Sequence, residues 1–210
     1  MISTQLEQPY WDSGTLVIGV DEAGRGALAG PVAAAAVIFD PKQIPLGLND
    51  SKVLTSQRRL ELSTIIKDAA IFWSVALVDH NRIDEVNILQ ATYDAMHEAI
   101  NDCVRSAGIK GPLHCLIDGN RFRPHPISST TIIKGDALSV SIAAASILAK
   151  TTRDEWMVKE ALNHPAYRFA QHKGYGTQMH RSAIIANGPC AIHRRTFLKN
   201  ILQQDAMVAP

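Results

Sequence analysis

The stretch Thr15-Leu-Val-Ile-Gly-Val-Asp-Glu22 decides the fold class of this 210-residue chain. Residues 15–20 are mostly β-branched or apolar, which is typical of a buried strand, and the run ends at two carboxylates. A glycine-rich turn follows, and residues 32–39 form a second run of the same kind. We therefore predict two neighbouring core strands, with Asp21 and Glu22 directly after the first.

Outward from this pair, three more runs favour strands and four segments favour helices. The expected strands are residues 71–78, 113–117 and 130–133, and the expected helices are residues 62–69, 89–103, 138–150 and about 177–188. Strands alternating with helices predict an α/β fold around a central sheet. Three of the five runs end at or near an acidic residue, namely Asp21, Asp118 and Asp136.

Length and composition indicate one large globular domain, or one domain with a small appendage. Apolar residues make up 46% of the chain and charged residues 20%, the usage of an ordinary soluble protein rather than a disordered one. The N-terminus has no basic stretch followed by an apolar run, and no segment approaches about 18 consecutive apolar residues. We expect a soluble, non-exported, cytoplasmic protein that does not engage a membrane.

The three cysteines, Cys103, Cys115 and Cys190, are odd in number and lack the spacing of a zinc site. We expect reduced thiols in the core. The net charge of +1 conceals an asymmetry, because residues 150–210 hold 9 of the 21 basic side chains and only 4 of the 20 acidic ones. This basic part is suited to contact with a polyanion, although a solvated basic face is the simpler alternative.

Carboxylates at the ends of several strands converge when the sheet is central to the fold, and we predict that Asp21, Glu22, Asp118 and Asp136 form a metal site. Four carboxylates without an accompanying set of His or Cys ligands favour hard cations such as Mg2+ or Mn2+. Such ions suit phosphodiester hydrolysis, because one can activate a water and a second can stabilise the leaving oxygen. Repulsion among the clustered acids also favours cation binding.

The segment Gly24-Arg25-Gly26 follows the first two carboxylates directly. Two glycines flanking an arginine allow the backbone to approach a ligand closely while a cation is presented. The segment has neither the GxxxxGK[ST] nor the GxGxxG spacing, so a mononucleotide cofactor has little support. A tight turn between two strands is the structural alternative.

Eight ordered motifs resemble those of the bacterial ribonuclease HII family, from about residue 15 to about residue 197. Any one of them is weak, but their order excludes chance similarity. They are Asp21-Glu-Ala-Gly-Arg-Gly26, Asn49-Asp-Ser-Lys52, Leu116-Ile-Asp-Gly-Asn120, Ile133-Lys-Gly-Asp136, Ala143-Ala-Ala-Ser-Ile-Leu-Ala-Lys150, Thr152-Arg-Asp154, His172-Lys-Gly-Tyr-Gly176 and His193-Arg-Arg195.

The resemblance implies a ribonuclease H-like α/β fold with a mixed five-stranded sheet, helices on both faces and a helical C-terminal region. The implied organisation is a catalytic core over residues 1–160 and a helical region over residues 161–210 that completes the substrate groove, within one compact unit. The implied activity is two-metal-ion hydrolysis, with Mn2+ or Mg2+, of the RNA strand of RNA/DNA hybrids. It includes cuts 5′ of ribonucleotides embedded in duplex DNA, leaving 3′-hydroxyl and 5′-phosphate ends. By analogy with the family, a monomer is expected.

Carried over by motif, Asp21, Glu22, Asp118 and Asp136 match the family's catalytic and metal-binding carboxylates. Gly24, Arg25 and Gly26 match its segment for reading the ribonucleotide 2′-hydroxyl, Lys52 matches a substrate contact, and Tyr175 matches the tyrosine that packs on the sugar at the RNA–DNA junction. Two positions depart from the family's usual residues. Val53 stands where a second lysine is often found, and Ala27 stands where proline is common.

Two rival functions remain open from the residues alone. One is another nuclease of the same fold superfamily, and the other is a duplex-binding module that has lost its chemistry. The presence of all four acids favours an enzyme, and the Gly-Arg-Gly turn with Tyr175 favours the ribonuclease. His172 could support acid–base chemistry, face phosphate or lie exposed, whereas Arg194 and Arg195 are expected to contact phosphate or a helix C-terminus.

Overall fold

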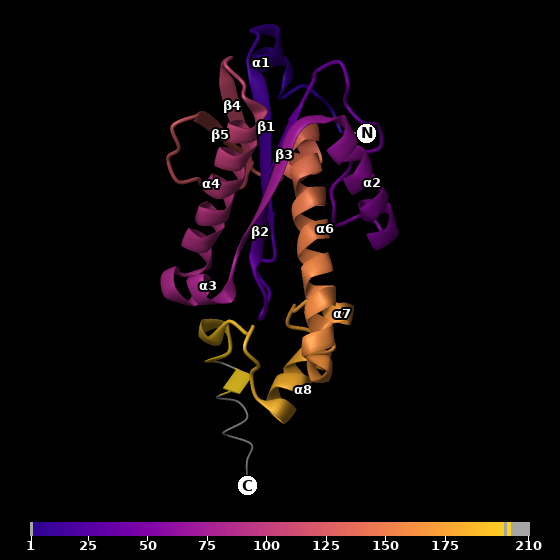
Figure 1. Ribbon diagram of the computed structural model, residues 1–210, viewed down its shortest axis with the longest axis vertical. Coiled ribbons are helices and arrows are strands. Elements are labelled where there is room, and N and C mark those ends of the chain that lie inside the picture. The colour runs from indigo at the N-terminus through magenta and orange to yellow at the C-terminus, as the bar shows by residue number, and fades with distance from the viewer. Residues whose placement is uncertain (1, 200, 203–210) are drawn as a thin grey trace.

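A five-stranded mixed sheet lies at the centre of the computed structural model, which describes residues 2–199, 201 and 202 (Figure 1). Its strand order is β3-β2-β1-β4-β5. Strand β1 pairs antiparallel with β2 and parallel with β4, β2 pairs antiparallel with β3, and β4 pairs parallel with β5. The strands are β1 Leu16–Ala23, β2 Val32–Phe39, β3 Ala70–Val78, β4 Leu113–Asp118 and β5 Ser128–Ile132. The predicted α/β class and mixed five-stranded sheet are confirmed.

Helices cover both faces of the sheet, as Figure 1 shows for α4 and α6. The 24-residue α6 crosses β1 and β2 on one face beside α2, and α4 lies on the other face beside α3. The helices are α1 Gln8–Asp12, α2 Ser56–Ala69, α3 His80–Val86, α4 Ile88–Ala107, α5 Gly135–Leu138, α6 Val140–Asn163, α7 Phe169–His172 and α8 Gln178–Asn187, and the 3-10 turns are Pro165–Tyr167 and Arg195–Phe197.

Side-chain caps explain where the helices begin. The hydroxyl of Thr55 accepts a hydrogen bond from the backbone of α2, that of Ser139 does so for α6, and that of Thr177 does so for α8. The start expected near Thr177 is thus confirmed, and Gly188 follows the end of α8 at a positive φ of 69°. Helix α6 continues to Asn163 without a break, so the predicted domain boundary near residue 160 falls inside a helix.

Strands β1 and β5 have other bounds than the sequence predicted. Strand β5 covers Ser128–Ile132 rather than residues 130–133. Strand β1 continues to Ala23, so Asp21 and Glu22 lie within it, opposite Ala35 and Ala34 of β2. The prediction that both acids follow the strand is therefore wrong. The antiparallel ladder to β2 extends beyond the parallel ladder to β4, which ends at Val20, and an apolar run cannot show this difference between two neighbours.

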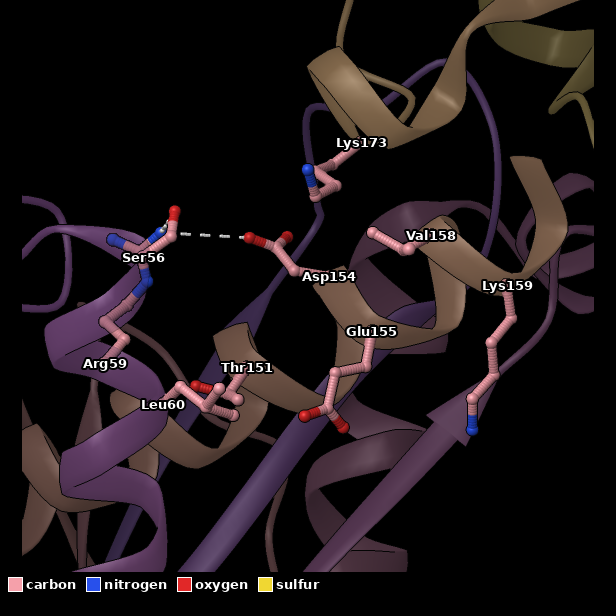
Figure 2. Close-up of a pocket in the computed structure, with 9 residues that line it drawn as sticks. All are labelled: Ser56, Arg59, Leu60, Thr151, Asp154, Glu155, Val158, Lys159 and Lys173. Carbon is pink, nitrogen blue, oxygen red and sulfur yellow. Dashed lines mark hydrogen bonds and ion pairs between the residues drawn. The ribbon is translucent and has the colours of Figure 1, made fainter. Parts of the chain in front are cut away.

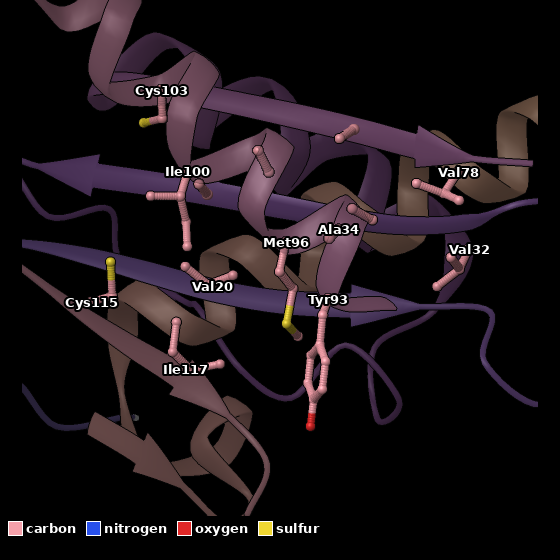
Figure 3. Close-up of a cluster of buried hydrophobic side chains, with 14 of the residues drawn as sticks. Val20, Val32, Ala34, Val78, Tyr93, Met96, Ile100, Cys103, Cys115 and Ile117 are labelled. Carbon is pink, nitrogen blue, oxygen red and sulfur yellow. The ribbon is translucent and has the colours of Figure 1, made fainter. Parts of the chain in front are cut away.

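Two hydrophobic cores fill the layers on either side of the sheet. Alternate residues of β1 and β2 contact α4 on one face, where Val20, Met96 and Ile117 lie close together (Figure 3). On the other face, small residues permit a close approach of α6 to the sheet. A Cβ at Gly19 would lie 2.1 Å from the backbone of Ser141, so only glycine fits there. This contact fixes α6 beside the strand that carries Asp21.

A third cluster joins the C-terminal elements to the end of α6 and to the β1–β2 loop. Met157, Tyr167 and Phe169 are its large buried members, together with Leu28 and Ala29 of the loop. Among residues 2–199, 201 and 202, no helix is long and apolar enough to span a membrane. The three cysteines are free, and Cys103 and Cys115 are buried as expected.

Candidate active site

Strand pairing brings three of the four predicted carboxylates together. The parallel ladder between β1 and β4 ends with the pair Val20 and Ile117, and the next residue on each strand is acidic. Asp21 and Asp118 therefore leave the same end of two adjacent strands, with Glu22 one residue further along β1. This is the convergence that the sequence predicted.

Burial makes the charge on these carboxylates costly. Burial raises the pKa of Asp21 well above its usual range, and the negative charges of Glu22 and Asp118 raise it further. Burial also raises the pKa of Glu22, although Arg25 opposes the shift, and it raises the pKa of Asp118. Three acids that resist ionisation beside one another create a strong demand for a compensating cation.

Asp136 enters from the short helix that follows β5. Lys134 has a left-handed backbone with a φ of 58° and begins the turn that places Gly135 and Asp136 under the sheet end. The Gly135 amide donates a 2.7 Å hydrogen bond to Asp118, which links the two acidic segments. Asp136 accepts a 2.5 Å hydrogen bond from the Lys52 ammonium, and this contact raises the pKa of Lys52 against the effect of burial.

The donor set fits a hard divalent cation, because it consists of carboxylate oxygens with no competing imidazole or thiolate. No three or more His, Cys, Asp or Glu side chains within the described ranges form a ready coordination sphere. The Lys52 ammonium supplies the positive charge beside Asp136 instead. Asp21, Glu22 and Asp118 remain as the carboxylates whose negative charge has no lysine partner at hydrogen-bonding distance.

A cavity of about 200 Å³, here called the carboxylate cavity, collects most of the predicted site. A second cavity of about 230 Å³ adjoins it, because Glu22 and Asp118 line both. The two hollows thus meet at Glu22 and Asp118, whereas Asp21 lines only the carboxylate cavity. The carboxylate cavity is lined by Asp21, Glu22, Ala23, Gly24, Ser51, Lys52, Asp118, Ser146, Lys150 and Tyr175, and the adjoining one also by Arg25, Tyr93, Asn120 and Arg121.

The Gly24-Arg25-Gly26 segment starts the β1–β2 loop beside these acids. Gly24 has a positive φ of 94°, and Arg153 occupies the space where a side chain would point, 2.0 Å from an ideal Cβ. Gly26 differs, because it is exposed and an ideal Cβ there meets no atom within 4 Å. Arg25 is half exposed and lies 3.4 Å from Glu22. Only Gly26 thus offers open space to a ligand.

Tyr175 reaches the carboxylate cavity from the C-terminal region. A β-bridge to Ala27 attaches its backbone to the β1–β2 loop. Its half-buried ring has the Lys150 ammonium 5.1 Å from its centroid and the Arg153 guanidinium carbon 5.2 Å from it. Two cations beside one ring hold its orientation through cation–π attraction.

The largest cavity described here, about 540 Å³, is not at the acids. It lies between α2 and α6, with Leu60 and Val158 in its apolar wall and Arg59 3.9 Å from Asp154 across it (Figure 2). The surface of this cavity is mostly apolar. None of the predicted site residues lines it. Cavity volume alone therefore does not identify the predicted site, because the proposed chemistry depends on the four carboxylates.

Two expectations about single residues of the basic C-terminal part, His172 and Arg194, are wrong. His172 neither lies exposed nor faces phosphate or an acid–base partner, because one ring nitrogen lies 2.8 Å from the Tyr167 carbonyl and the other accepts from the Gly174 amide. Arg194 contacts neither phosphate nor a helix C-terminus, since it is 0% exposed and donates to carbonyls of the β1–β2 loop. Arg153 is equally buried, so two of the nine basic residues after position 149 cannot meet a polyanion.

The structure adds residues to the site that the sequence did not single out. Lys150 lines the carboxylate cavity with its ammonium over the ring of Tyr175, and Ser146 on the same helix shares a 2.9 Å hydrogen bond with Ser51. Ser146 also bonds to Asp21 and lowers its pKa against the effect of burial. A spacing of four residues on one face of the Ala-rich helix could have indicated this pair.

Comparisons with known proteins show the family of the chain. Residues 18–200 match the family model described as Ribonuclease HII. The ribonuclease HII of Chlorobaculum parvum is 51% identical over 202 residues, covering 94% of this chain and 96% of the relative. That of Parabacteroides distasonis is 50% identical over 191 residues, covering 90% and 93%.

Solved structures share the fold. Ribonuclease H2 from Pyrococcus horikoshii OT3 aligns with a TM-score of 0.72 at 26% identity, covering 91% of this chain and 99% of that one. Bst-RNase HIII in complex with Mn2+ aligns with a TM-score of 0.71 at 19% identity, covering 92% and 71%. Since the family model spans most of the chain and relatives of the same length share half of their residues with it, this protein belongs to the ribonuclease HII family.

Proposed function

We propose that this metal-dependent endoribonuclease cuts the RNA strand of RNA/DNA hybrids, and cuts 5′ of single ribonucleotides in duplex DNA, at Asp21, Glu22, Asp118 and Asp136. One observation carries the proposal. The buried Asp21 and the half-buried Glu22 and Asp118, all with raised pKa values, line one cavity with Gly24 and Tyr175. The rival inactive duplex-binding module has no need of such costly charges.

The proposed cofactor is Mn2+ or Mg2+, held by these four carboxylates. Bst-RNase HIII, which shares the fold, was solved with Mn2+. Bound divalent cations would activate a water and offset the charge on the leaving 3′-oxygen. The carboxylates would hold the cations at the sheet end, beside both hollows. In the proposed reaction the water oxygen bonds to phosphorus as the P–O3′ bond breaks, the water gives up a proton and the 3′-oxygen takes one up, which leaves a 3′-hydroxyl and a 5′-phosphate.

The proposed substrate contacts flank the acids on two sides. Backbone groups of Gly24, Arg25 and Gly26 read the 2′-hydroxyl, and the ring of Tyr175 packs on the sugar at the junction. The bridge between Ala27 and Tyr175 supports both roles, because it sets the distance between the two readers. Lys52 would be free to contact phosphate if a bound cation took its place beside Asp136. The C-terminal region from residue 161 completes the substrate groove through Tyr175.

A duplex DNA carrying one ribonucleotide tests the proposal. We expect one cut on the 5′ side of the ribonucleotide in Mg2+ or Mn2+, and none in the all-DNA duplex of the same sequence. Asp118→Asn should lose cleavage while keeping its melting temperature and its affinity for the duplex. Asp68→Asn, an exposed acid on α2, is the matched control and should cleave normally. Binding without cleavage by the parent would favour the duplex-binding module.

A further inference from the structure

Arg194 is a buried cation whose three guanidinium nitrogens all bind the β1–β2 loop. Its Nε donates to the Gly30 carbonyl, its Nη1 to the Arg25 carbonyl and its Nη2 to the Pro31 carbonyl, each at 3.0 Å. The side chain is 0% exposed. Burial lowers the pKa of Arg194 to about 9, so it stays charged at neutral pH. A buried charge is costly, and here it is solvated by loop carbonyls.

One of these contacts fixes the direction of a peptide in the site. The Arg25–Gly26 peptide is trans, so its C=O and N–H groups point in opposite directions. Because the Arg25 carbonyl points inward to Arg194, the Gly26 N–H points outward. Neither the Arg25 nor the Gly26 amide donates a hydrogen bond to any residue that the structure describes. Within the described part of the chain, the Gly26 N–H is therefore a free donor on an exposed residue, two positions from Gly24 of the carboxylate cavity.

We propose that Arg194 is a positioning residue for ribose recognition, because it holds the Gly26 N–H outward to donate to the 2′-hydroxyl oxygen at the cleavage site. This inference rests on the proposed function, in which the 2′-hydroxyl is the group that separates RNA from DNA. Phosphate contacts cannot supply this distinction. A donor fixed before binding also saves the entropy of ordering a glycine-rich loop.

The geometry requires arginine rather than any cation. A guanidinium presents donors in a rigid planar fork, whereas a lysine offers one compact ammonium on a flexible stem. Lysine at position 194 can approach some of the three carbonyls but cannot hold all of them. Arg153 has the same design, with donors to Pro31, Lys173 and Ala29 at 2.8 to 3.0 Å, none of them in the Arg25–Gly26 peptide. The melting temperature of Arg153→Lys therefore measures what such a change costs in stability, and only its melting temperature is compared, because Arg153 also lies beside the ring of Tyr175.

The test compares Arg194→Lys with the parent in binding two duplexes that differ by one 2′-hydroxyl, with Ca2+ in place of Mg2+. One hydrogen bond contributes about 1 kcal/mol, so the parent should prefer the ribonucleotide duplex by about fivefold and the variant should lose that preference. Its affinity for the all-DNA duplex should stay within about twofold, and its melting temperature close to that of Arg153→Lys. An unchanged preference in a folded variant overturns the inference.

Two further readouts keep the outcomes distinct. If the parent does not cleave the ribonucleotide duplex in Mg2+, the proposed function fails, whereas a parent that cleaves it but binds both duplexes equally overturns the inference alone. If Arg194→Lys does not fold, the parent's Gly26 amide resonance still decides the matter by NMR. We expect it to shift on adding the ribonucleotide duplex and to stay in place on adding the all-DNA duplex. Equal responses to the two duplexes would show that this amide reads no sugar.

Discussion

The substitution Gly26→Ala separates folding from sugar recognition. An ideal Cβ at Gly26 meets no atom within 4 Å, and Gly26 does not have a positive φ. A methyl group is therefore tolerated in the free protein, and we expect stability to change by no more than about 1 kcal/mol, towards stabilisation. The same methyl occupies the space from which a sugar would approach the Gly26 amide.

The loss in activity follows from that blocked approach. A donor and its acceptor are about 2.9 Å apart in such a contact, so a sugar bound to the amide lies against the added methyl. Forcing one methyl into a packed contact costs about 1–3 kcal/mol, which corresponds to a loss of roughly 5- to 150-fold in kcat/KM. The assay is cleavage of a duplex with one ribonucleotide, beside thermal unfolding of the free protein.

Two glycines of the same chain serve as controls. Gly111 also has open space around its Cβ position and lies outside the site, so Gly111→Ala should leave both activity and stability unchanged. Gly24→Ala should lower the melting temperature strongly. Its Cβ would lie 2.0 Å from Arg153, and its φ of 94° is unfavourable to alanine. Parent-like cleavage by a stable Gly26→Ala protein would refute the placement of the sugar beside this residue.

Four other outcomes follow from the site and its surroundings. Tyr175→Ala should lower cleavage at a single ribonucleotide far more than it lowers the melting temperature, whereas Tyr175→Phe should keep most activity because packing needs only the ring; equal rates for the parent and the alanine variant would contradict this. Cleavage should require Mg2+ or Mn2+, whereas Ca2+ should support binding alone, and full activity in excess chelator would exclude metal catalysis. Duplex affinity should fall as salt rises, since phosphate contacts release counterions, and a salt-independent Kd would refute this contact. The buried His180 and His193, whose Nε2 atoms lie 3.0 Å apart, have pKa values lowered by burial from 6.5 to about 4, so the folded state binds fewer protons there. Their contribution to stability is complete above pH 6.5 and is lost as pH falls towards 4, and ring titrations near pH 6.5 by NMR would contradict it.

Lys52 and Lys150 both lie in sequence motifs, but the sequence did not predict which groups they contact. Lys52 lies in a motif that indicated a substrate contact, yet its ammonium binds Asp136 from 84 positions away. Lys150 ends a motif for which no role could be given, and it lies over the ring of Tyr175. Both contacts join segments that are far apart in the chain, 84 positions for Lys52 and Asp136, and local spacing does not report such contacts.

Local patterns of the sequence determined the elements and their chemistry. The run before Asp21 determined β1, because β-branched and apolar side chains favour a buried strand, and the hydroxyl of Thr177 determined the start of α8. Asp21, Asp118 and Asp136 lie at or near the ends of three such runs, and this pattern predicted a cluster of negative charge at one end of the sheet. Parallel neighbours such as β1 and β4 bring their ends to the same edge. These features depend on residues close in the chain.

Only the tertiary structure decided which charges face the substrate and which hold the fold. Arg153 and Arg194 belong to the basic part of the chain, but the carbonyls that they bind lie between 20 and 169 residues away. His172 has its ring nitrogens at hydrogen-bonding distance from backbone groups of its own loop, and that loop is shaped by packing against α6. A charged side chain lies inside a protein only where its partners converge, and that convergence is a property of the complete fold rather than of any segment.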